Sequence, residues 1–224
     1  MENYQRYAIY YAPRAGDFAD RCSDWLAGTA KVSGPEGLGP HLNGDLTSEP
    51  RRYGFHATLR APFRPANGIG GRAIAAHVAA LAETLAPPHC EGLRLADLDG
   101  FVALVPQGDA TALMDFAAGV VTATNALRAP LDAADIARRR PEGLTPRQKA
   151  LLEIWGYPYV MEEFRFHLTL TNRLAEGRVK PLISALAAHF APVLPRPFVI
   201  EDLCLFGEDA SGRFHLLSRH ALIG

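Results

Sequence analysis

Two short segments of this chain repeat the same pattern of residue types. Residues 55–59 read Phe-His-Ala-Thr-Leu, and residues 166–170 read Phe-His-Leu-Thr-Leu. Side chains alternate between the two faces of a strand, so the His and the Thr of each segment share one face and the apolar residues share the other. This pattern favours a site rather than plain core. Two such strands can bring two imidazoles and two hydroxyl groups to one cleft.

The polar residues on these faces are suited to acid–base chemistry at phosphorus. Histidine exchanges protons near neutral pH, so one of His56 and His167 can take a proton from a nucleophile while the other gives one to a leaving group. Phosphodiester cleavage and cyclic-phosphate opening need both roles. The hydroxyl groups of Thr58 and Thr169 can donate hydrogen bonds to phosphate oxygens. Strict alternation also places Arg60 on the first face, where it would add a fixed positive charge.

Further residues are candidates for substrate binding. Thr171 continues the polar face of the second segment, and Tyr53 precedes a flexible glycine that would let it reach a ligand. The aromatic residues of segment 155–159, Tyr159 among them, either form a wall against a base or sugar or anchor this segment to the body of the protein. For the arginines at 138–140, a solvated loop is favoured over a phosphate clamp.

The sequence favours chemistry without a metal or another cofactor. A zinc site needs three or four nitrogen, sulfur or carboxylate ligands in a fixed geometry. His56 and His167 can supply two, but Thr is a poor third ligand, and no His-x-His or His-x-x-x-His spacing occurs. The three cysteines are too widely spaced for a metal knuckle or a disulfide framework, which favours a reducing compartment.

The bulk composition favours a small ligand. The chain has 224 residues, 48% of them apolar, and a formal net charge of −1. This balance creates no field that attracts a long polyanion, so a small phosphorylated substrate is favoured over long nucleic acid. No signal peptide is visible, and no apolar stretch reaches the roughly 18 residues that a membrane helix needs. We expect a cytoplasmic protein without a membrane partner, and the oligomeric state stays open.

Each half of the chain is expected to hold a His-bearing strand, a helix and two further strands. In the first half these elements are expected at residues 53–61, 72–85, 91–98 and 101–105. In the second half they are expected at residues 165–172, 179–190, 198–206 and 213–221. Other expected elements are a strand at 7–12, helices at 17–26 and 111–127, and a loop at 33–50 rich in Gly, Pro and Asn.

The repeated order predicts an α+β fold in which equivalent strands meet across a pseudo-twofold axis. We expect one domain of two lobes, about residues 1–128 and 160–224, with the two His strands side by side at the centre. An insertion at about 130–159 separates the lobes. Its first part is irregular, and its second part contains a short helix with Thr145 as N-cap and Pro146 in the first turn.

The chain resembles the 2H phosphoesterase superfamily, which is named for two His-x-[Ser/Thr]-apolar motifs on two lobes. Residues 56–59 and 167–170 both match this motif. More narrowly, residues 52–59, 155–159 and 166–171 resemble a branch that is often encoded with bacterial phosphonate-utilisation genes. The resemblance implies antiparallel sheets flanked by helices, metal-free chemistry, the two histidines as acid and base, and the two motif threonines as phosphate ligands.

The expected function is that of a metal-independent phosphoesterase. Its substrate would be a small cyclic phosphate or phosphodiester, either a sugar phosphate or a nucleotide, and phosphonate metabolism is one setting for it. One alternative is a non-catalytic protein that binds a nucleotide or cyclic phosphate. Another is an RNA 2′,3′-cyclic phosphodiesterase, which would need a basic rim around the cleft. The assignment of acid and base, the site of cleavage and a lid role for the insertion stay open.

Overall fold

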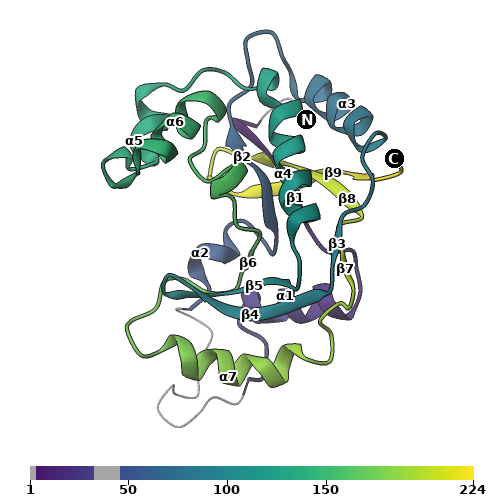
Figure 1. The fold of residues 1–224 in the computed structure, drawn as a ribbon, viewed down its shortest axis with the longest axis vertical. Coiled ribbons are helices and arrows are strands. Elements are labelled where there is room, and N and C mark those ends of the chain that lie inside the picture. The colour runs from purple at the N-terminus through teal and green to yellow at the C-terminus, as the bar shows by residue number, and fades with distance from the viewer. Residues whose placement is uncertain (1–3, 33–45) are drawn as a thin grey trace.

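In the computed structural model, which describes residues 4–32 and 46–224, seven strands form one sheet in the order β4-β5-β6-β2-β1-β8-β9 (Figure 1). Each pairing within this sheet is antiparallel. Strands β3 and β7 form a separate antiparallel pair. The strands are β1 Arg6–Tyr11, β2 Ala57–Phe63, β3 His89–Cys90, β4 Gly92–Leu98, β5 Phe101–Gln107, β6 Leu168–Thr169, β7 Phe198–Val199, β8 Asp202–Glu208 and β9 Phe214–Ala221.

Helices cover the sheet and form the insertion. The helices are α1 Asp17–Ala27, α2 Ser48–Arg51, α3 Gly71–Ala82, α4 Thr111–Ala123, α5 Ala133–Arg138, α6 Pro146–Trp155 and α7 Val179–Phe190. Short 3₁₀ turns are η1 Asn125–Leu127, η2 Pro141–Gly143 and η3 Met161–Glu163.

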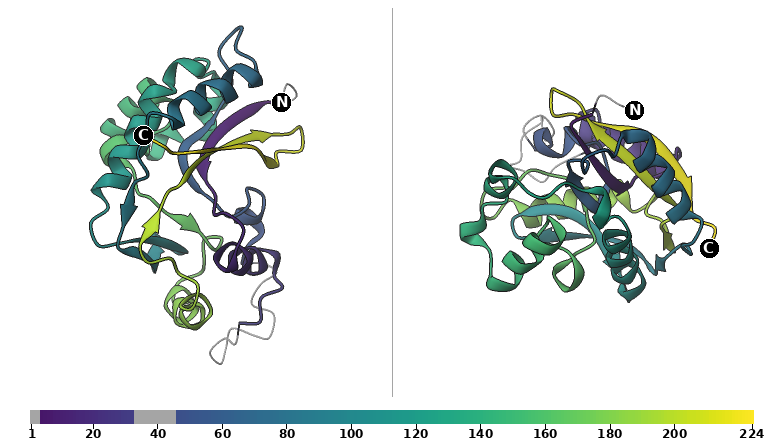
Figure 2. Two further views of the ribbon diagram at one scale, coloured as in Figure 1. Left: turned by 90° about the vertical axis from the view of Figure 1, so that its right-hand side faces the viewer. Right: turned by 90° about the horizontal axis from the view of Figure 1, so that it is seen from above.

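The sheet divides at its centre into two lobes (Figure 1). One lobe holds β2, β1, β8 and β9, with α3 and α4 packed against it, and the other holds β6, β5 and β4, with α7 packed against it. Figure 2 shows the same division from the side, where yellow β8 and β9 lie with purple β1 and α7 lies at the opposite end of the molecule. The predicted fold class, a bilobal antiparallel α+β protein, is confirmed.

The halves of the sheet do not follow the halves of the chain. β4 and β5, which come early in the sequence, are joined to β6, whereas the late strands β8 and β9 return to pair with β1. This order differs from the lobe bounds that we predicted, residues 1–128 and 160–224. The reason is that strand pairing depends on long-range contacts, and a repeat seen along the sequence does not specify which copies of its strands pair.

Most local elements lie close to their predicted positions, with the following differences. The strand predicted at 198–206 is divided into β7 and β8, which belong to different sheets. The His-bearing strands are shorter than predicted, since β2 begins at Ala57 and β6 comprises only Leu168–Thr169. Helix α2 at Ser48–Arg51 replaces the end of the predicted loop 33–50, of which residues 33–45 lie outside the described residues. The first part of the insertion is more regular than predicted, because α5 precedes α6.

Both insertion helices begin with reciprocal capping. The Thr145 hydroxyl accepts a hydrogen bond from the backbone N–H of Gln148, and the Gln148 Oε1 accepts one from the backbone N–H of Thr145, so the predicted N-cap is confirmed. Asp132 and Asp135 form the same arrangement at the start of α5. Helix α6 ends at Gly156, whose φ of 78° is the left-handed conformation that glycine adopts without strain.

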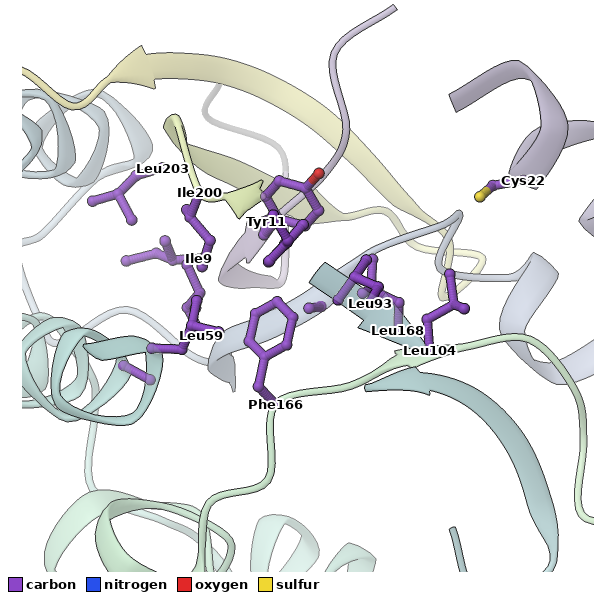
Figure 3. Close-up of a cluster of buried hydrophobic side chains, with 14 of the residues drawn as sticks. Ile9, Tyr11, Cys22, Leu59, Leu93, Leu104, Phe166, Leu168, Ile200 and Leu203 are labelled. Atoms are coloured by element: carbon purple, nitrogen blue, oxygen red, sulfur yellow. The ribbon is translucent and has the colours of Figure 1, made fainter. Parts of the chain in front are cut away.

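The apolar faces of both His segments lie in the main core (Figure 3). Leu59 and Leu168 are fully buried with Ile9 and Tyr11 of β1, and Phe166 packs beside them. The predicted alternation is therefore largely visible as burial: the apolar residues of each segment are buried, apart from the partly buried Phe55, which packs against the core, while its His and Thr are only partly buried. Burial of this face holds the polar face in a fixed position.

Two further features concern the helices and the cysteines of the described residues. No helix in the described residues has both the length and the apolar character needed to cross a membrane. The three cysteines, Cys22, Cys90 and Cys204, are buried and unpaired.

Replacing Trp25 should weaken the packing behind the second His segment. The fully buried Trp25 on α1 donates a hydrogen bond from its indole Nε1 to the carbonyl oxygen of Leu170, at 2.8 Å. Trp25→Phe leaves that buried carbonyl without its partner, so we expect the free energy of unfolding, measured with urea, to fall by about 1–3 kcal/mol. Trp155→Phe, at the half-buried second tryptophan, is the matched control. An equal loss in both variants would contradict this account.

Candidate active site

The central strand pair brings the two predicted motifs together. β2 and β6 are antiparallel, with Ala57 opposite Leu168. Continuing this register by one residue each way places His56 across from Thr169, and His167 across from Thr58. Residues opposite each other in a sheet point to the same face, so each histidine lies beside the threonine of the other motif.

The two imidazoles are held in the same way. His56 Nδ1 lies 2.9 Å from the carbonyl oxygen of Gly54, and His167 Nδ1 lies 2.7 Å from that of Arg165. A carbonyl oxygen only accepts, so in each ring Nδ1 carries the proton and Nε2 has a free lone pair. In both copies the acceptor is the residue two positions before the histidine. His56 Nε2 lies 3.3 Å from the Thr58 hydroxyl oxygen.

Burial controls the charge of both histidines. It lowers the pKa of His56 to about 4, against the opposing effect of the Gly54 hydrogen bond, and positive charge on His167 adds a smaller lowering. Burial also lowers the pKa of His167. The Tyr10 ring stacks on His56 with centroids 4.0 Å apart. Both imidazoles are therefore neutral near pH 7 in the free protein, which is the form of a general base.

Two cavities meet at Thr58, whose side chain lines both. The first cavity, of about 430 Å³, lies on the His56 side and includes Tyr53 and Thr169. The second, of about 640 Å³, lies on the His167 side and includes Tyr159, which is 46% exposed. Both volumes are in the range of small-molecule sites. The cleft between the motifs therefore has room for a ligand that extends in both directions from the threonine.

Thr171 lines the first cavity but has a structural contact. It is 1% exposed, and its hydroxyl oxygen accepts a hydrogen bond from the backbone N–H of Val102 at 2.9 Å. This bond ties the segment after β6 to β5. The hydroxyl hydrogen remains available for one further contact, so Thr171 can donate to a ligand but cannot use its oxygen freely.

Arg60 does not lie beside the histidines, contrary to the expectation from alternation. Thr58 pairs with Tyr10 and Arg60 with Ile9, so a β-bulge at Leu59 interrupts the period of two. After the bulge Arg60 shares the core side of Ile9. The Arg60 guanidinium is buried and donates to the Trp155 carbonyl at 3.0 Å and to Asn125 Oδ1 at 3.3 Å. It lines neither of the two cavities.

Other arginines line the first cavity instead. Arg6, Arg138 and Arg139 all contribute to its wall. Arg6 is ion-paired with Glu208 and belongs to β1. The sequence favoured a solvated loop for 138–140, and the structure places two of these three residues at the site because α5 turns toward β2. In the sequence, the arginines at 138–140 and the aromatic segment at 155–159 lie within one insertion. This proximity was the available signal that the arginines belong to the site.

The described His, Cys, Asp and Glu side chains form no metal centre. Within residues 4–32 and 46–224, no group of three or more His, Cys, Asp or Glu side chains is arranged to hold a metal ion. The chemistry derived below uses only the chain's own residues.

Comparison with known proteins shows the family. The chain belongs to the family described as "Protein of unknown function (DUF1045)", whose profile matches residues 58–215. The match contains both His-motif threonines and the whole insertion, and it begins within the first motif.

Two curated relatives are each named "Ribose 1,5-bisphosphate phosphokinase PhnN". The protein from Janthinobacterium sp. (strain Marseille) is 34% identical over 224 residues, covering 94% of this chain and 49% of the relative. The protein from Laribacter hongkongensis (strain HLHK9) is 37% identical over 220 residues, covering 96% and 51%. The chain thus spans about half the length of these relatives. Its sequence lacks the Gly-x-x-x-x-Gly-Lys-[Ser/Thr] phosphate loop of P-loop kinases.

Solved structures of LigT from E. coli resemble the chain over its whole length. The structure complexed with phosphate is 15% identical with a TM-score of 0.48, and the structure complexed with 3′-AMP is 16% identical with a TM-score of 0.47. Both matches cover 99% of each chain. At these identities and scores, the role of every residue rests on this chain's own geometry.

The hydrogen bonds and burial of the two imidazoles predict their NMR behaviour. In ¹⁵N-histidine spectra we expect both rings as the Nδ1–H tautomer when neutral, with His56 titrating near pH 4 and His167 below 6.5, because burial disfavours the imidazolium. His56→Ala and His167→Ala assign the signals. An Nε2–H tautomer, or a His56 midpoint above 6.5, would contradict the site geometry.

Proposed function

We propose that this protein is a metal-independent phosphoesterase of the 2H type, acting on a small cyclic phosphate or phosphodiester. The observation that carries the proposal is the matched presentation of two imidazoles. Each has its Nδ1 bonded to a backbone carbonyl, which leaves the lone pair on Nε2, and each has the other motif's threonine across the strand pair. A core histidine needs no such second copy, whereas proton transfer on both sides of a phosphorus atom does.

We assign His56 as the general base and His167 as the general acid from the direction of their pKa values, because their hydrogen bonds are equivalent. The more strongly lowered pKa of His56 keeps it unprotonated, so its Nε2 can take a proton from the attacking water or ribose hydroxyl. The oxygen of this nucleophile forms a bond to phosphorus as the bond to the leaving oxygen breaks. Protonated His167 gives its Nε2 proton to that leaving oxygen. The carbonyl oxygens on Nδ1 stabilise each imidazolium as it forms.

Thr58 and Thr169 would hold the phosphate between the two rings. Their hydroxyl groups lie on the same face as the imidazoles and line the first cavity, where they can donate to the non-bridging oxygens. A bound phosphate is anionic, so it raises the pKa of a nearby histidine and favours the protonated acid. Binding of the substrate would therefore favour protonation of His167, the general acid, in the complex.

The substrate we propose is a phosphorylated sugar or a nucleotide. Tyr157 and Tyr159 lie edge to face, 5.6 Å apart, in the second cavity, and offer an aromatic wall for a base or sugar. The curated relatives are named for a ribose bisphosphate, and the motif resemblance is to a branch associated with phosphonate utilisation, both of which support a ribose phosphate. A cyclic phosphate of such a sugar is the form that this acid–base pair would open.

Removing either imidazole should abolish most turnover. We would test purified protein with excess chelator on 2′,3′-cyclic nucleotides, ADP-ribose cyclic phosphate and ribose cyclic phosphates. General acid and general base each contribute about 10²–10⁴ to the rate, so we expect losses of that size in kcat for His56→Ala and for His167→Ala, with unchanged folding by circular dichroism. His77→Ala, on the exposed face of α3, is the control.

Three outcomes would count against this assignment. Near-normal turnover in either single variant would remove the two-histidine mechanism, and loss of wild-type turnover on chelation would remove the metal-free chemistry. Saturable binding of a panel member without turnover, with affinity alone changed in the variants, would instead support the non-catalytic binding protein.

The lowered pKa values of both histidines predict an acidic optimum. The active form has one imidazole unprotonated and the other protonated, and this form is most populated between the two pKa values of the free protein. His56 is near 4 and His167 is below 6.5, so kcat/KM should be greatest below pH 6.5 and fall as the acid loses its proton at higher pH. A pH–rate profile that is flat or still rising above pH 6.5 would contradict this.

A further inference from the structure

We propose that Arg139 binds a second phosphoryl group of the substrate, separate from the phosphate at the two histidines. The substrate class is then a small molecule that carries two phosphoryl groups, one of them in the ester that is cleaved. This inference rests on the proposed phosphoesterase function and narrows it. The observation that supports it is the partly buried guanidinium of Arg139, which lies on the wall of the His56 cavity and has no carboxylate partner among the described residues.

Arg139 has no ion-pair partner among the described residues, although the Asp135 carboxylate acts on it from a longer distance. In residues 4–32 and 46–224, its only side-chain hydrogen bond goes to the carbonyl oxygen of Pro62, at 3.5 Å, and no carboxylate lies within ion-pairing distance. The nearby Asp135 is engaged by Arg64 at 2.7 Å and by Arg138 at 3.7 Å. A guanidinium has five N–H donors, so most donors of Arg139 are left for a ligand.

The surroundings favour an anion rather than solvent alone. Burial lowers the pKa of Arg139, and the positive charges of Arg6 and Arg138 add to this lowering, against the opposing effects of Tyr157 and Asp135. An anion placed among these charges would relieve both effects. The Arg139 guanidinium also lies over the Tyr157 ring, 4.7 Å from its centroid, and this contact favours its present position. The planar guanidinium of an arginine suits bidentate recognition of a phosphoryl group.

The position of Arg139 separates this group from the reacting phosphate. Its guanidinium is held at Pro62, four residues along β2 from Thr58. With a rise of about 3.3 Å per residue, less the shortening at the bulge, the two points are about 10–13 Å apart. This separation of the two backbone positions leaves room for a second phosphoryl group at Arg139, beside one held by Thr58. A five-carbon sugar with a phosphate at each end is of the size to bridge the two positions within one cavity.

A matched pair of compounds tests this assignment. Adenosine 2′,3′-cyclic phosphate and its 5′-phosphorylated form differ only by the second phosphoryl group. We would measure the affinity of both by calorimetry on full-length His167→Ala protein, so that neither compound is consumed. A charge-assisted bidentate contact is expected to give about 10- to 100-fold tighter binding of the 5′-phosphorylated form. Added Arg139→Gln should bring that ratio close to 1, and Arg139→Lys should restore part of it.

The neighbouring Arg140 provides the matched control. It is exposed and lines neither cavity of the cleft, so added Arg140→Gln should leave the affinity ratio unchanged. Thermal unfolding of each variant separates loss of the contact from loss of the fold. Equal affinities for the two compounds, no binding of the 5′-phosphorylated form, or a ratio that survives Arg139→Gln would overturn the inference.

The two proposals fail in different ways. Turnover of both compounds by the wild-type protein with equal affinities would leave the phosphoesterase function in place and remove the second phosphoryl site. An affinity ratio that depends on Arg139, with no turnover of either compound by the wild-type protein, would keep the site and remove the enzymatic function.

Discussion

The pairing of β2 with β6 is the contact on which the rest of the structure depends. It is the one junction between the two lobes within the described sheet, and it is short, because β6 has only two residues. Its register, with Ala57 opposite Leu168, sets which histidine faces which threonine. A slip by one residue would turn every side chain of one motif to the opposite face. Packing of Leu59, Leu168 and Phe166 into the core fixes this register, so the buried face specifies the geometry of the polar face.

The proposed mechanism places two opposed demands on the histidines. Burial raises the free energy of the imidazolium, which favours a base, whereas a general acid must carry a proton. The backbone carbonyls on Nδ1 favour the charged form without introducing a carboxylate that would repel a phosphate. Gly54, with a φ of 72°, aims one of these carbonyls through a left-handed turn that few other residues adopt. The negative charge that would balance an imidazolium is thus expected from the phosphate of the ligand.

Local features of the sequence predicted much of this arrangement. The alternation of the two motifs is largely visible as burial, and the strands predicted at 91–98 and 101–105 are present as β4 and β5. They are joined by Asp99-Gly100, with φ of 53° and 98°, as a two-residue hairpin requires. Non-local features were not predictable in the same way. The bulge at Leu59 moves Arg60 to the core side, and the interleaved strand order depends on contacts between distant segments. Neither the bulge nor the strand order changes the periodic pattern of apolar and polar residues along the sequence.

The insertion and the paired strands contribute different parts of the site. The strands carry the two histidines that we propose as proton-transfer groups, and their positions are set by the core. The insertion carries Arg139 and Tyr157, which reach the same cavities from the side and are positioned by the capped helices α5 and α6. Substitutions in the insertion can therefore alter which molecule is bound without altering the register of β2 and β6. This division explains why the motifs identify the chemistry, while the choice of substrate must be sought in the residues between them.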